Sequence, residues 1–162
     1  MSKPLRRLLL ALELLCLALW TGSLFGFAFF TAPTVFSVVG APSVAGKVTR
    51  LVLGNLDFLA VILAVLVLLS LLLRRAGTAW HRWLRVAAVA VMLGLTLYAH
   101  VGIVGRMNAI QARMDQPIEK YALSDPLRAE YDRYHARSRS VYGGVLLLGM
   151  ALIAAAPWQN ED

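Results

Sequence analysis

Residues 51–73 read LVLGNLDFLAVILAVLVLLSLLL, an apolar run that carries Asn55 and Asp57 near its beginning. The hydrocarbon core of a lipid bilayer is about 30 Å thick, and a helix of about 20 apolar residues crosses it. This run is therefore long enough to cross a membrane as one helix. It predicts a protein of the lipid bilayer rather than a soluble domain.

Three further stretches meet, or nearly meet, the same length requirement: residues 8–32, 86–105 and 141–156. The first is interrupted only by Glu13, and the next contains His100. The last is short for a bilayer, so we expect its helix to draw Ser138 into the membrane boundary and to span residues 138–156. The sequence thus predicts an all-α integral membrane protein with four transmembrane helices in an antiparallel bundle.

The composition agrees with one membrane domain. Hydrophobic residues make up 59% of the 162 residues and charged residues 15%, whereas charged residues are about a quarter of a soluble domain. The net charge of +7 does not indicate a nucleic-acid partner, because the basic residues flank apolar runs instead of forming one face. They include Lys3, Arg6, Arg7, Arg74, Arg75, Arg82 and Arg85. The lone Cys16 cannot form an internal disulfide and is expected to be a small buried hydrophobe.

The first apolar run could be mistaken for a signal peptide. It is too long for one and contains Glu13, and Pro33 directly follows the one alanine that could precede a cleavage site. We therefore expect a retained transmembrane helix. Because the first helix and its basic tail usually dominate orientation, both termini are predicted to be cytoplasmic.

Helices are expected to extend beyond the bilayer on the side that holds the 33–50 and 106–139 segments. Pro42 offers a helix start well ahead of the second span. On the same side, a polar, amphipathic segment covers residues 106–137. The protein should therefore be lopsided, because the other side has only a short turn and the two tails.

Asp125 and Pro126 have the pattern of a helix N-cap followed by a proline at the first helical position. No proline interrupts residues 127–156, so one long helix can run from the polar segment into the fourth span. One face of this helix carries four polar or aromatic side chains: Tyr131, His135, Ser138 and Tyr142.

Small residues mark faces where helices could approach closely. Gly22 and Gly26 form a GxxxG pattern in the first span, and Gly94 follows Ala90 at the same spacing in the third. Such spacing favours helix packing in a bilayer, although small residues are also common in transmembrane helices in general. Together with Pro33, these glycines are the predicted helix-packing residues.

Three more polar residues lie at the same membrane end as the stripe on the last helix: Asp57, Asn55 and His100. Polar groups inside a membrane are costly and usually face the interior between helices, where they mark functional sites. The seven residues of the two groups are therefore candidates for a pocket between helices at the membrane boundary.

Two other interpretations of these residues stay open. Histidines and a carboxylate suit a metal ion, but no spacing places two ligands on one helix face, so no metal ligand and no cofactor are assigned. Alternatively, the polar groups only hydrogen-bond across helices, or Asp57 pairs with Arg50 or Arg106.

Glu13 lies near the opposite membrane end and is expected to form a structural ion pair. Its candidate partners are Arg74, Arg75 and His81. No nucleophile elbow, phosphate-binding loop or zinc-protease pattern is present, and a pair of His135 with Ser138 would need a third orienting group. The sequence thus predicts a protein that is not an enzyme.

Several short elements resemble the transmembrane protein 205-like family, whose bacterial members are described as a domain of unknown function. They are residues 19–22 (LWTG), 29–36 (FFTAPTVF), 45–46 (AG) and the Tyr131, His135, Ser138 spacing. The resemblance implies four spans and residence in a membrane, here the bacterial inner membrane. The family often has a proline and a basic residue at the end of the third span, where this chain has Gly105 and Arg106.

The favoured function is therefore non-enzymatic: an interhelical polar pocket that binds or helps move a small molecule or ion. The first alternative is a structural or assembly partner that docks another membrane protein, or a second copy of itself, through the polar segment. The other alternative is a copper-type metal-binding or metal-dependent membrane protein, because copper-resistance membrane proteins have a similar start to their first span.

Overall fold

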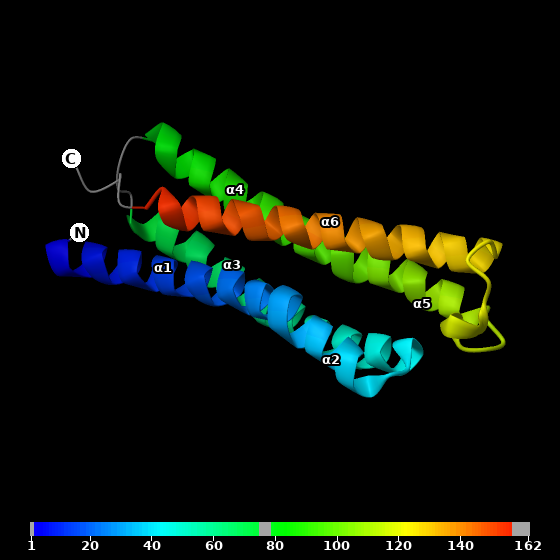
Figure 1. Cartoon of the computed structure of the whole chain (residues 1–162). Helices are drawn as coiled ribbons and strands as arrows, with labels where there is room; N and C mark the ends of the chain where they lie inside the picture. Colours follow the sequence, from blue (N-terminus) through cyan, green and yellow to red (C-terminus); the bar gives the residue numbers. More distant parts are fainter. Residues whose placement is uncertain (1, 75–78, 157–162) are drawn as a thin grey trace.

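The computed structural model describes residues 2–74 and 79–156, and all secondary structure in these ranges is helical (Figure 1). Arg75, Pro157 and Trp158 lie outside the described residues. The elements in chain order are α1 (Lys3–Gly26), η1 (Phe27–Thr31), α2 (Ala32–Val39), α3 (Pro42–Arg74), α4 (Ala79–Leu97), η2 (Tyr98–Val104), α5 (Gly105–Ala112), η3 (Ile118–Lys120) and α6 (Pro126–Ala154).

Three continuous helical stretches are long and apolar enough to cross a membrane: Lys3–Val39, Pro42–Arg74 and Trp80–Ala112. They contain the first three predicted spans, and they fit an integral membrane protein in contact with lipid. Helix α6 is long but starts with a polar half, so only its last part is apolar.

The first helical stretch continues through Pro33, beyond the predicted end of the first span at residue 32. Pro33 lies in the first turn of α2, and a π-helical segment, η1, comes directly before it. Proline removes one backbone donor, and a wider turn is one way for a helix to continue past it. Within the 33–50 segment, α2 ends at Val39, Gly40 follows with a left-handed φ of 68°, and α3 begins at Pro42 as predicted.

The third helical stretch also extends further than residues 86–105. It continues through η2, a second π-helical segment, and through α5 as far as Ala112. The polar segment 106–137 contains the end of this helix, a loop with the short η3, and the start of α6.

The start of α6 is confirmed. The Asp125 carboxylate accepts hydrogen bonds from the backbone N–H groups of Leu127 and Arg128, at 2.8 and 3.3 Å, and Pro126 occupies the first turn. This satisfies donors that a helix start leaves without partners. The helix ends at Ala154, close to the predicted position.

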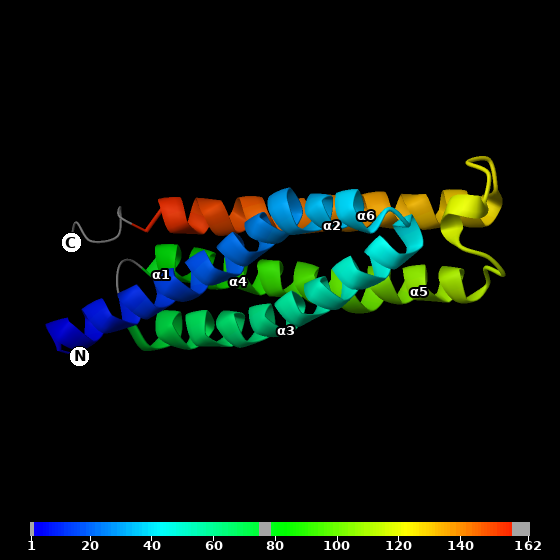
Figure 2. The same cartoon turned by 60° about the horizontal axis from the view of Figure 1, so that its bottom comes forward.

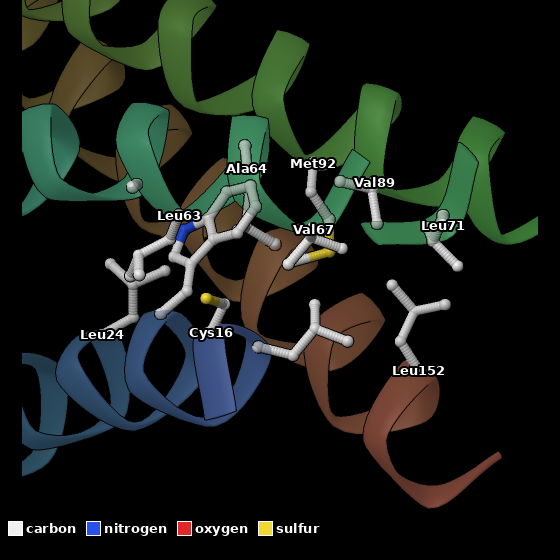
Figure 3. Close-up of a cluster of buried hydrophobic side chains, with 13 residues drawn as sticks. Cys16, Leu24, Leu63, Ala64, Val67, Leu71, Val89, Met92 and Leu152 are labelled. Atoms are coloured by element: carbon white, nitrogen blue, oxygen red, sulfur yellow. The ribbon is translucent and has the colours of Figure 1, made fainter. Parts of the chain in front are cut away.

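The long helices lie side by side along one axis (Figures 1 and 2), with α1 packed on α3 and α6 packed on both α1 and α4. Figure 3 shows their common core, in which Trp20, Val67 and Met92 are almost completely buried. Cys16 is 2% exposed, so the prediction of a small buried hydrophobe is confirmed.

The glycines chosen from the sequence do not mark close contacts within the chain. A Cβ atom on Gly22, Gly26 or Gly94 would meet no other atom within 4 Å. A Cβ on Gly149 would instead overlap the Thr21 hydroxyl and lie 3.2 Å from Met92 Cε. Helix α6 therefore approaches α1 and α4 closely at Gly149, a glycine that is not part of the repeated small-residue spacing.

Candidate functional site

The Asp57 cluster consists of Asp57, His100 and Tyr142, which come from α3, η2 and α6. The Tyr142 hydroxyl lies 3.0 and 2.8 Å from the two carboxylate oxygens of Asp57 and donates to them. His100 Nδ1 lies 2.9 Å from Oδ2 of the same carboxylate. Asp57 is 5% exposed, so each of its oxygens finds a partner inside the protein.

Local structure explains how the two aromatic side chains reach Asp57. His100 lies in the π-helical segment η2, and such segments are frequent at functional sites because they reorient side chains. The His100 ring lies against Gly54, one turn before Asp57: a Cβ at Gly54 would lie 3.8 Å from His100 Cε1, in ordinary van der Waals contact. Neither Arg50 nor Arg106 pairs with Asp57.

A cavity of about 390 Å³ lies on the other side of Tyr142, between the η1–α2 region and α6. Its wall is mostly apolar, with polar groups toward the loop end of the molecule. The lining residues include Leu24, Phe27, Phe36, Leu53, Leu146, Thr49, Arg50, His135, Ser138, Arg139, Tyr142 and Gly143. Helix α1 packs on α6, whereas α2 and α6 diverge toward the loop end of the molecule (Figure 1), and residues of both α2 and α6 line the cavity.

The structure places five of the seven predicted pocket residues at two adjoining sites. His135, Ser138 and Tyr142 line the cavity, whereas Asp57 and His100 lie behind Tyr142. The remaining two do not contact the cavity: Asn55 is exposed on α3, and Tyr131 stacks on His135 with ring centroids 6.4 Å apart.

The described residues contain no group of three His, Cys, Asp or Glu side chains close enough to hold a metal ion. His135 therefore does not join Asp57 and His100 as a third ligand. Asp57 and His100 belong to one cluster, whereas His135 lines the cavity.

Two arginines of the cavity were missed from the sequence. Arg50 precedes the second apolar run and Arg139 precedes the last one. Basic residues at the ends of spans are normally assigned to the interface with lipid headgroups. Both arginines lie at the end of an apolar run on the same side of the membrane as His135. This shared position could have indicated that they belong to the site.

The second buried polar group is the Glu13 cluster, formed by Glu13, Arg74 and Arg85 near the termini. Glu13 is fully buried, accepts a hydrogen bond of 3.0 Å from Arg74, and also pairs with Arg85. Arg85 further donates to the Leu152 carbonyl at 3.1 Å, which ties α4 to α6. The predicted ion pair with Arg74 is confirmed, and Arg85 is an additional partner.

Replacing Tyr142 by phenylalanine is expected to lower the free energy of unfolding by about 1 kcal/mol, because Asp57 loses one of its two partners. Unfolding of the purified protein in mixed micelles measures this change. Tyr134→Phe on the same helix is the control, since Tyr134 makes no hydrogen bond in the described structure. Equal stability of the two variants would show that the Tyr142 bond contributes nothing.

Comparison with known proteins adds one result. A protein family described as a domain of unknown function, DUF4149, matches residues 15–116. The matched part includes Asp57, His100 and the α1, η1 and α3 walls of the cavity, but α6 lies beyond it. No curated protein and no solved structure matches the chain.

Proposed function

From the premise that this chain belongs to the DUF4149 family of domains of unknown function, we propose that it is a multi-pass membrane protein that binds one small molecule in the cavity beside Tyr142. The proposal assigns no reaction to the site. The narrower resemblance to transmembrane protein 205-like proteins belongs to this proposal too, because the Tyr131, His135 and Ser138 element lies outside the matched residues.

The proposal includes a fourth span in α6. Its apolar part, from Val141 onward, packs against α1 and α4 and contributes Val145 and Leu152 to the shared core. A helix that shares its core with two membrane-crossing helices has to lie at the same depth. With four spans, both termini are on one side, and the basic residues beside the short 75–78 connection favour the cytoplasm.

The cavity is the observation that carries the proposal. Its volume of about 390 Å³ lies within the range of small-molecule sites, which are commonly about 300–1,000 Å³ and mostly apolar with a few polar groups that fix orientation. The apolar walls come from Leu24, Phe27 and Leu146, and the polar groups gather at one end. Such an arrangement suits an elongated molecule with one polar end.

Two neighbouring glycines on α6 allow a direct test. A Cβ on Gly143 or on Gly144 would meet no atom within 4 Å, but only Gly143 lines the cavity. Gly143→Leu therefore fills the cavity, and Gly144→Leu makes the same chemical change outside it. Native mass spectrometry of protein purified in a mild detergent reports whether a small molecule remains bound.

We expect the unaltered protein and Gly144→Leu to carry bound mass, and Gly143→Leu to have lost it. Gly143→Ala, which fills less space, should lose only part of it. If all four proteins carry the same bound mass, or none does, the cavity is not a binding site. Thermal unfolding of each variant separates a loss of binding from a loss of the fold.

A further inference from the structure

The polar end of the cavity carries positive charge. Arg50 and Arg139 both line it, and neither forms an ion pair with a carboxylate among the described residues. Arg50 is half-buried and is held in place by hydrogen bonds from Nη1 to Asn108 Oδ1 at 2.6 Å and from Nε to the Gly46 carbonyl at 3.2 Å. Both partners are neutral, so the guanidinium charge is not compensated.

The acidic groups nearest this end are already engaged elsewhere. Asp132 pairs with Arg128 at 3.0 Å. The Glu119 carboxylate accepts a hydrogen bond of 2.9 Å from Ser43, and backbone and Ser43 hydrogen bonds hold its pKa below the usual value. Asp57 faces Tyr142 and His100, behind the cavity wall.

His135 adds hydrogen-bonding capacity without adding charge at neutral pH. Although its ring is exposed on one side, partial burial lowers the pKa of His135, and the neighbouring Arg139 lowers it further. The ring is therefore neutral near pH 7, and the positive charge of the cavity resides on the two arginines. Ser138 offers a hydroxyl group beside them.

We propose that the cavity binds an anionic lipid from the surrounding bilayer, with its headgroup on Arg50 and Arg139 and an acyl chain along the apolar wall. This inference rests on the proposed function, because it names the ligand of the same cavity. Arginine is the side chain best suited to phosphate, which it binds through paired, charge-assisted hydrogen bonds. Basic pockets between transmembrane helices are known to hold anionic headgroups.

The shape of the cavity favours a lipid over a small soluble anion. A soluble anion needs only the arginine end, whereas the cavity continues past Phe27 and Leu53 to Leu24 and Leu146. Phe29 and Phe36 line the cavity and are also exposed at the protein surface, so lipid of the bilayer can reach the cavity beside them. Phe29 is 59% exposed and Phe36 is 43% exposed.

The test uses the full chain, stripped of bound lipid in mild detergent and titrated with phosphatidylglycerol or with phosphatidylcholine. Native mass spectrometry measures the lipid-bound fraction for each. We expect phosphatidylglycerol to bind roughly tenfold or more tightly than phosphatidylcholine, the effect of one or more charge-assisted hydrogen bonds. Arg50→Gln combined with Arg139→Gln should remove this preference, and lysine at both positions should retain part of it.

The matched control is Arg106→Gln combined with Arg133→Gln, two exposed arginines at the same end that do not line the cavity. This control should keep the full preference. Equal affinity for both lipids, or an unchanged preference in the Arg50/Arg139 variant, overturns the inference. If the unaltered protein binds both lipids equally and Gly143→Leu abolishes the binding of both, the cavity binds lipid without selecting the headgroup: the inference fails and the proposed function stands. If Gly143→Leu changes neither affinity, the proposed function itself fails.

Discussion

Replacing Glu13 by alanine is expected to lower the free energy of unfolding by about 3–5 kcal/mol, the cost of removing one partner from a buried ion pair. Glu13 is fully buried, and its two partners, Arg74 and Arg85, are only 4% and 5% exposed. The substitution leaves two guanidinium groups inside the helices with no carboxylate between them. Inside a low-dielectric interior this like-charge pair is strongly unfavourable.

Reversible unfolding in mixed detergent micelles measures the loss. Glu130→Ala is the control, because the Glu130 side chain is only partly buried and its ion pair with Arg113 is long, at 3.8 Å. It should change stability by no more than about 0.5 kcal/mol. If the Glu13→Ala variant is about as stable as the Glu130→Ala control, the Glu13 cluster has no structural role.

A second variant isolates the charge as the cause. Replacing Arg74 and Arg85 by methionine in the Glu13→Ala background removes the two cations that Glu13 neutralised and supplies apolar side chains of similar length. Buried ion pairs can often be replaced in this way with little net cost. Most of the lost stability should therefore return, apart from the contribution of the hydrogen bond between Arg85 and the Leu152 carbonyl.

The sequence predicted the helices better than it predicted their ends. Apolar length alone identified the stretches at 8–32, 51–73 and 86–105, because the bilayer demands a fixed length of apolar helix. It could not show that the first helix passes through Pro33 or that the third continues to Ala112. Each of these two helical stretches contains a π-helical segment, and no residue pattern in the sequence predicted a π-helical segment.

The same π-helical turns explain which site residues could be predicted. A helical wheel assumes about 100° per residue, and it correctly grouped His135, Ser138 and Tyr142 on one face of the regular helix α6. It gives no direction for His100, which lies within η2 and turns toward Asp57. The contact between Asp57 and Tyr142 was expected only as a possible hydrogen bond across helices, because depth in the membrane does not fix which helices are neighbours.

Replacing Gly149 by leucine is expected to destabilise the protein by at least about 3 kcal/mol, at or above the upper end of typical overpacking. Even the first added carbon overlaps the Thr21 hydroxyl and comes within 3.3 Å of Thr21 Cβ. Thr21 is buried on α1, and Met92, fully buried on α4, closes the other side. The helices must therefore move apart, and the core in Figure 3 loses its packing.

Gly144→Leu on the same helix is the matched control, since a side chain there meets open space. It should leave the unfolding midpoint in mixed micelles nearly unchanged. Gly149→Ala should cost less than Gly149→Leu, about 1–3 kcal/mol. Adding Thr21→Ala to Gly149→Ala should recover part of this loss, because the Thr21 hydroxyl is buried without a hydrogen-bond partner and its removal relieves the overlap. Equal stability of Gly149→Leu and Gly144→Leu would mean that α6 does not pack closely on α1.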